Sequence, residues 1–196
     1  MKDSAPQRMT SITAMEPVQD ENVDDDKWPT ILCDLHFKVI GRKLHFEFHQ
    51  PQPPYNEPFS TVMARALDAN YRPTHKFRNH ATIWLTASSR VIVRLNSEND
   101  WKFWPEERGL RIESVDLHRV VNLRHATLDP NGQLSLEPLS PRDVTCQVIS
   151  FDVVTPPAPW PRGRPVNLFI ATSGQDGVDV PLIVDPDVKN GGPPQP

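Results

Sequence analysis

Three histidines and a glutamate are the first residues whose types and spacing suggest chemistry. His45, Glu47 and His49 alternate along one stretch, so in a strand their side chains share a face, and His36 falls on the same face of the stretch before it. Imidazole and carboxylate groups are zinc ligands. A spacing of two residues separates side chains by ~6.5–7 Å along a strand, however, and this suits a solvated face of cross-strand pairs. We expect no metal or other cofactor, and keep His36, His45 and His49 as a metal-binding alternative.

A short basic segment is the second candidate. Residues 71–80 include Arg72, His75, Lys76 and Arg78 beside two aromatic side chains. Cations can bind phosphate groups, and aromatic rings can stack on bases. All of the net charge of −4 lies in the first thirty residues, so the remainder is neutral and does not favour a nucleic-acid partner. A basic surface loop explains the segment as well. The alternative is a nucleotide- or anion-binding protein, or an enzyme, that uses residues 72–80.

Tryptophans near predicted connections form the third group. Trp104 stands just before a proline, and Trp160 lies inside a proline-rich stretch, whereas Trp101 and Phe103 share one strand face and are expected in the core. Large rigid rings at connections can act as binding platforms, although aromatic side chains more often close the ends of a β-sandwich. With the basic residues, they complete our set of candidate binding residues: Arg72, His75, Lys76, Arg78, Trp104 and Trp160.

Motifs of the common enzyme classes are absent from the chain. It contains no glycine-rich phosphate loop, no dinucleotide-binding glycine pattern, no nucleophile elbow, no H-E-x-x-H zinc motif and no C-x-x-C pair. The two cysteines, Cys33 and Cys146, form no disulfide framework. Cys33 shares an apolar face with its neighbours and is predicted to be a buried free thiol. We therefore predict no catalytic residues.

The polar residues of the first candidate are positioned by a predicted β-hairpin over residues 31–50. Two alternating stretches flank the pair Gly41-Arg42, a favoured two-residue loop. In that register Phe37 pairs with Phe46 on a wholly apolar face, while His36 pairs with Glu47 on the polar face. A slip of one residue would destroy both faces, so the pattern also predicts the register.

The remaining elements predict an all-β fold. The chain has 196 residues and 22 prolines, which argues against a helical bundle. About nine short strands with turn-rich connections indicate an antiparallel, immunoglobulin-like β-sandwich. A short helix is expected at 60–70, with Ser60 as a candidate N-cap. Proline-rich connections are expected at 51–58 and 156–165, and Pro181 predicts an edge strand or a bulge.

Composition divides the chain into three parts. Residues 1–28 are predicted to be a disordered acidic tail, 29–189 a single β-sandwich domain, and 190–196 a flexible C-terminal tail. Neither an apolar signal segment nor a membrane-length apolar run is visible. We expect a soluble, cytoplasmic protein, bacterial in style, that does not contact a membrane.

The last predicted strand has a characteristic ending. It runs into Asp185 and Pro186, followed by Val188 and Asn190. Proline restricts Asp185 to an extended conformation, and Asp or Asn side chains can satisfy backbone groups where strand pairing stops. We interpret Asp185, Pro186 and Asn190 as a structural ending of a strand, not as catalytic residues.

This ending, together with Val91–Leu95 and Trp101-Lys102-Phe103, resembles the DP-EP family of small proteobacterial proteins. The resemblance covers about residues 80–190. It implies a small β-rich domain and no established activity. The acidic tail and the histidine-bearing hairpin depart from the compact members of that family.

These observations lead to one expected function and two alternatives. The expected function is a non-enzymatic binding or interaction module that takes an unknown protein or small ligand on the loops of a rigid scaffold. The alternatives are the nucleotide- or anion-binding role of residues 72–80 and the metal-binding role of the histidine face. No oligomeric state is predicted.

Overall fold

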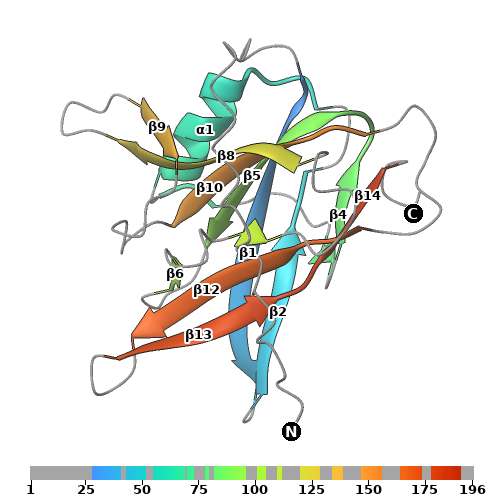
Figure 1. Ribbon diagram of the computed structural model, residues 1–196. Helices are drawn as coiled ribbons and strands as arrows, with labels where there is room; N and C mark the ends of the chain where they lie inside the picture. The colour runs from blue at the N-terminus through green and yellow to red at the C-terminus, as the bar shows by residue number, and fades with distance from the viewer. Residues whose placement is uncertain are drawn as a thin grey trace, which may run out of the picture.

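The computed structural model shows a seven-stranded sheet at the centre of a mostly β structure (Figure 1). The structure describes residues 28–40, 43–51, 55–68, 70–72, 78–79, 82–95, 101–104, 110–111, 120–128, 134–138, 147–155, 164–173 and 178–190. The central sheet has the order β3-β2-β1-β5-β10-β8-β9. Its strands are β1 (Thr30–Ile40), β2 (Lys43–His49), β3 (Arg78–Asn79), β5 (Ser89–Leu95), β8 (Val120–Leu128), β9 (Leu134–Pro138) and β10 (Val148–Val153).

Two smaller sheets accompany the central one. The first has the order β11-β14-β4, with β11 (Arg164–Pro165), β14 (Asp187–Asn190) and β4 (Thr82–Leu85). In the second, β12 (Asn167–Ser173) pairs with β13 (Asp179–Val184), β6 (Lys102–Phe103) and β7 (Leu110–Arg111). None of these sheets closes on itself within the described residues.

The first hairpin has the predicted register. β1 and β2 pair in antiparallel fashion, with Phe37 opposite Phe46 and His36 opposite Glu47. Alternation of apolar and polar side chains is a local property of period two, and one buried face therefore suffices to fix the pairing. The prediction is confirmed.

The purely antiparallel arrangement expected from the sequence is wrong at two places. β1 runs parallel to β5, and β4 runs parallel to β14. Parallel neighbours need a long crossover connection, and both pairs have one. Residues 41–88, including β2 and the helix, separate β1 from β5. The described residues contain fourteen strands, four of them only two residues long.

The two faces of the central sheet pack against different partners. One face carries Ile31, Val91 and Phe151 and shares a core with Leu168 and Ile170 of β12. The opposite face carries a second core beneath the helix α1 (Phe59–Leu67), made of Leu32, Phe59, Val62, Met63, Ala66, Ile92, Ala126 and Val148. In Figure 1, α1 and the pair β12–β13 accordingly lie on different sides of the sheet.

The helix starts one residue earlier and ends three residues earlier than predicted. Its N-cap is Pro58 and not Ser60, and no side chain caps the first turn. Proline fixes φ and has no backbone donor, so it is well tolerated at a helix start. Asp68 is extended and ends the helix.

The strand ending at Asp185 and Pro186 moves the chain from one sheet to another. β13 ends at Val184 and β14 begins at Asp187. The carbonyl of Pro186 accepts a hydrogen bond from the backbone N–H of Val166 at 2.9 Å. Asn190 belongs to β14, so the described strand extends one residue into the predicted C-terminal tail. The predicted edge at Pro181 is confirmed, since β13 lies at the end of its sheet.

Several predictions lie outside the described residues. These are the acidic tail before Trp28, the residues after Asn190, and most of the proline-rich connection 156–165. Elsewhere two core predictions are confirmed: Trp101 and Phe103 are buried, and Cys33 is a fully buried free cysteine.

Candidate functional site

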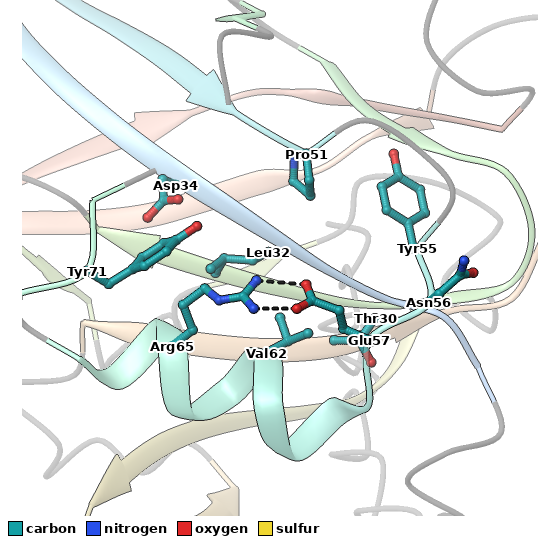
Figure 2. A pocket seen from close by; sticks show the side chains of 10 residues that line it. All are labelled: Thr30, Leu32, Asp34, Pro51, Tyr55, Asn56, Glu57, Val62, Arg65 and Tyr71. Atoms are coloured by element: carbon teal, nitrogen blue, oxygen red, sulfur yellow. Dashed lines mark hydrogen bonds and ion pairs between the residues drawn. The ribbon is translucent and has the colours of Figure 1, made fainter. Parts of the chain in front are cut away.

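A cavity of about 260 Å³ lies between α1, β1 and the connection that leads into the helix (Figure 2). Its walls come from β1 and from residues within the stretch 51–71, which includes α1. The lining residues are Thr30, Leu32, Asp34, Pro51, Tyr55, Asn56, Glu57, Val62, Arg65 and Tyr71. We refer to this cavity as the helix pocket.

The floor of the helix pocket is one face of β1. Thr30, Leu32 and Asp34 are two residues apart and share the face that looks towards α1. All three are almost completely buried. A strand in the middle of a seven-stranded sheet is held on both edges, so this floor is rigid.

An ion pair between Arg65 and Glu57 forms the wall on the helix side. Nη1 of Arg65 donates to Oε2 of Glu57 at 2.7 Å, and Nη2 donates to Oε1 in a second contact. The hydrogen bond to Glu57 raises the pKa of the Arg65 guanidinium, which therefore stays charged. Figure 2 shows this fork with Leu32 on one side of it and Val62 on the other. Both side chains remain partly exposed, at 28% for Arg65 and 51% for Glu57.

A second ion pair lies deeper, between Asp34 and Arg94. The two residues are register partners on the parallel strands β1 and β5. Nε of Arg94 donates to Oδ1 of Asp34 at 2.6 Å, and Nη1 donates to the carbonyl of Asp68 at 3.3 Å. Arg94 is thus tied both to the floor of the pocket and to the end of α1.

Tyr71 closes the pocket beside these two pairs. The guanidinium of Arg94 lies 4.9 Å from the centre of its ring and that of Arg65 5.6 Å away, which are cation–π distances. Burial is the largest cause that raises the pKa of the Tyr71 hydroxyl, followed by the negative charge of Asp34. The hydroxyl is therefore neutral at physiological pH.

Tyr55 holds the remaining wall in place through Gln50. Nε2 of Gln50 donates to the Tyr55 hydroxyl at 2.7 Å, and its Oε1 accepts from the backbone N–H of Trp84 at 3.0 Å. Burial raises the pKa of Tyr55 to about 12, so it also stays neutral. The amide of Gln50 thereby joins the central sheet to β4.

The histidine face continues the pocket floor along the hairpin. His49 is the register partner of Asp34, and its ring stacks on that of His36 with centroids 3.9 Å apart. Nε2 of His49 lies 3.3 Å from Oε2 of Glu47. His45 is exposed. Among the described residues, no three His, Cys, Asp or Glu side chains are grouped so that they could hold a metal ion.

The other sequence candidates are scattered. Arg72 is exposed, and its guanidinium donates to the carbonyl of Tyr71 at 3.1 Å. The backbone of Arg78 pairs with His49 at the edge of the central sheet. Trp104 is half-buried, and its backbone N–H donates to the backbone carbonyl of Phe169 at 2.9 Å. His75, Lys76 and Trp160 lie outside the described residues.

Sequence reasoning missed the residues that make the pocket. It gave no role to Arg94, Glu57 or Arg65, and it included Tyr71 only as an aromatic residue of the basic segment 71–80. Glu57 precedes the helix and only Arg65 lies in it. The eight-residue spacing between them therefore matches none of the i, i+3 or i, i+4 patterns that pair charges on a helix. The signal available was a charged residue in the middle of the apolar strand 91–95.

A second buried polar cluster lies at the other end of α1. Nε of Arg90 donates to Oδ1 of Asp152 at 2.7 Å, and the Asn122 amide donates to Oδ2 of Asp152 at 2.9 Å. Asn122 has a φ of 55° beside a register shift between β8 and β10. The adjoining cavity of about 10 Å³ has room for no more than about one water molecule. We interpret this cluster as structural.

No protein-family model matches the chain, and no curated protein matches it. Across the described residues, no helix combines the length and the apolar character needed to span a membrane.

Proposed function

We propose that the protein is a non-enzymatic binding module that holds a small ligand in the helix pocket. The observation that supports this proposal is the make-up of the pocket: a rigid strand floor, an apolar centre at Leu32 and Val62, and polar groups at both ends. Ligand sites commonly have an apolar lining with a few fixed polar groups. The volume of about 260 Å³ suits a ligand smaller than the usual drug-sized molecule.

The ionisable groups support binding in preference to catalysis. A general base works best when its pKa lies near the operating pH. Asp34 and Glu57 are held in ion pairs, while the raised pKa values of Tyr55 and Tyr71 keep both hydroxyls neutral. The Cys33 thiol lies on the opposite face of β1, and burial raises its pKa, so it is not a nucleophile for this pocket.

The proposal is tested by mapping small compounds onto the folded protein. A set of neutral, cationic, anionic and zwitterionic fragments is titrated, and two-dimensional amide NMR spectra are recorded. Binding should shift the signals of Leu32, Tyr55, Val62 and Arg65 together. The variant Asn56→Trp places a large ring at the exposed rim and should abolish these shifts.

The matched control is Lys43→Trp, which adds the same ring at an exposed position of β2 that does not line the pocket. It should leave binding unchanged. The proposal is wrong if no fragment shifts the pocket signals, or if Asn56→Trp binds as well as Lys43→Trp does.

Nucleotide or anion binding is a second candidate, favoured by the position of the basic segment. Arg72 directly follows Tyr71, which lines the helix pocket. The backbone of Arg78 lies opposite His49 in the central sheet. Thermal shift with ATP and with inorganic phosphate tests it: an increase in Tm that Arg72→Gln and Arg78→Gln remove would support this candidate.

Two finer proposals concern the fold and the family. The strands β12 and β13 face the central sheet across a shared core, which supports an immunoglobulin-like sandwich. Membership of the DP-EP family is proposed from the strand ending at Asp185 and Pro186. These two residues connect β13 of one sheet to β14 of another, which is a structural role. A cytoplasmic location is likewise proposed from the sequence.

A further inference from the structure

The charges around the helix pocket are balanced in pairs. Arg94 faces Asp34 in the floor, and Arg65 faces Glu57 in the wall. A ligand with a net charge would therefore add an uncompensated charge to a partly desolvated site, which is unfavourable. A ligand without net charge is favoured.

The two pairs differ in how easily they open. Asp34 and Arg94 are only 3% and 8% exposed, and breaking a buried ion pair is strongly unfavourable. Arg65 and Glu57 are much more exposed, and an exposed pair contributes little to stability. The Arg65–Glu57 fork is therefore the ion pair that a ligand can open, so that charged groups of the ligand contact Arg65 and Glu57 in place of their contact with each other.

The geometry of the fork restricts what can replace it. Both guanidinium ends of Arg65 point at the two oxygens of Glu57 in a bidentate arrangement. A ligand carboxylate can accept the same two N–H groups from Arg65. Glu57 then loses its contact with the guanidinium, and because the two side chains start in contact, a cation that replaces this contact must lie close to the ligand's carboxylate.

The apolar part of the pocket lies next to this fork. Figure 2 shows Leu32 and Val62 on either side of the ion pair, with Pro51 and Tyr55 across the cavity. Leu32 and Val62 also belong to the core under α1, so their positions are fixed by packing. A branched or aromatic group of a few carbon atoms would bury its surface here and gain hydrophobic free energy.

We infer that the helix pocket binds a small zwitterion with adjacent ammonium and carboxylate groups and an apolar side chain, the chemistry of a free apolar amino acid. Arg65 binds the carboxylate, Glu57 binds the ammonium group, and Leu32, Val62 and Tyr55 contact the side chain. This inference rests on the proposed function, because it names the ligand class of the same pocket.

The experiment compares four related compounds by NMR titration of the full chain. L-leucine carries both charges, L-leucinamide only the cation, N-acetyl-L-leucine only the anion, and 3-methylbutan-1-ol neither. L-leucine should bind with a Kd of about 1 mM or below, as expected for a ligand of this size. Each of the other three should bind at least tenfold more weakly.

Variants of the fork give a charge-specific signature. Glu57→Gln should weaken the binding of L-leucine and reduce the ratio by which L-leucine binds more tightly than N-acetyl-L-leucine, because the ammonium group has lost its partner. Arg65→Gln should also weaken the binding of L-leucine and should reduce the ratio by which L-leucine binds more tightly than L-leucinamide, because the carboxylate has lost its partner. Both positions are partly exposed, so the variants should fold. Lys43→Gln, at an exposed position outside the pocket, is the matched control and should bind like the wild type.

The outcomes separate this inference from the proposed function. If 3-methylbutan-1-ol shifts the pocket signals as strongly as L-leucine does, the pocket binds ligands but the zwitterion inference is wrong. It is equally wrong if none of the four compounds binds while other fragments do. Failure of every fragment at the pocket overturns the proposed function itself.

Discussion

At the residue scale, buried arginines shape the helix side of the central sheet. Arg90 and Arg94 lie four residues apart on β5, and each faces a carboxylate on a neighbouring strand. Ile92 lies between them and packs beneath α1. Charges that leave water lose hydration, and only a partner with good geometry compensates for that loss. Each arginine therefore stabilises the fold only as part of its pair.

Removing the carboxylate of Asp152 should be strongly destabilising. Asp152→Leu removes the carboxylate that accepts hydrogen bonds from buried Arg90 and from the Asn122 amide. The expected loss is about 3–5 kcal/mol in the free energy of unfolding. Urea unfolding followed by circular dichroism measures it.

The double variant Arg90→Met/Asp152→Leu is the control. It removes both charges and fills the space with apolar atoms, so it should be more stable than Asp152→Leu alone. If the double variant loses as much stability as the sum of the two single changes, the two groups are not coupled and the interpretation fails.

Tyr55 should make the protein sensitive to alkaline pH. Burial raises its pKa from 10.0 to about 12 in the folded state, so the folded state holds the proton more tightly than the unfolded state does. The corresponding stability is fully present below pH 10 and is lost as the pH rises towards 12. The loss can reach about 3 kcal/mol.

Unfolding free energies at pH 8 and pH 11 measure this effect in the wild type and in Tyr55→Phe. The variant loses the hydrogen bond from Gln50 at both pH values, but its stability should fall less between them. Cys33 and Tyr71, whose pKa values are also raised by burial, contribute to the remaining slope. An equal fall in both proteins would contradict the assignment to Tyr55.

At the element scale, β13 is an exposed edge strand protected by proline. It ends its sheet and carries the exposed apolar side chains Val180 and Ile183. An apolar edge can pair with another chain, and proline removes one backbone donor from it. Pro181, opposite Ala171 of β12, therefore disfavours edge-to-edge association.

Pro181→Val should increase self-association. The change completes the row of backbone donors on β13 and raises its β-propensity. Light scattering at increasing protein concentration measures the effect. Pro181→Lys restores the same donor but adds a charge that opposes pairing, so it should remain monodisperse. Equal association of the two variants would show that the edge is not the cause.

At the scale of the whole molecule, the central sheet connects two cores. Strands β1, β5 and β10 contribute alternate residues to the core with β12 and to the core under α1. Because the same backbone supports both, loss of either core should unfold the other. The helix pocket is thus attached to the cooperative unit of the protein.

Single truncations in either core should therefore have matching effects. Met63→Ala in α1 and Ile170→Ala in β12 remove fully buried side chains and should each cost about 2–5 kcal/mol. Far-UV circular dichroism and tryptophan fluorescence should give coincident unfolding curves in both variants. Ala64→Ser, on the exposed side of α1, should change stability by no more than about 0.5 kcal/mol. Separate transitions in either variant would show two independent units.

The sequence by itself determined the features that depend on local periodicity. The register of β1 with β2, the burial of Cys33 and the edge position of Pro181 follow from alternation and from the covalent geometry of proline. Only the tertiary structure decided the parallel pairing of β1 with β5 and the placement of α1 over them. That pairing joins Asp34 to Arg94 across sixty residues, and a short-range pattern carries no information about such a contact. The helix pocket exists because long-range packing, not spacing along the chain, brings its charges together.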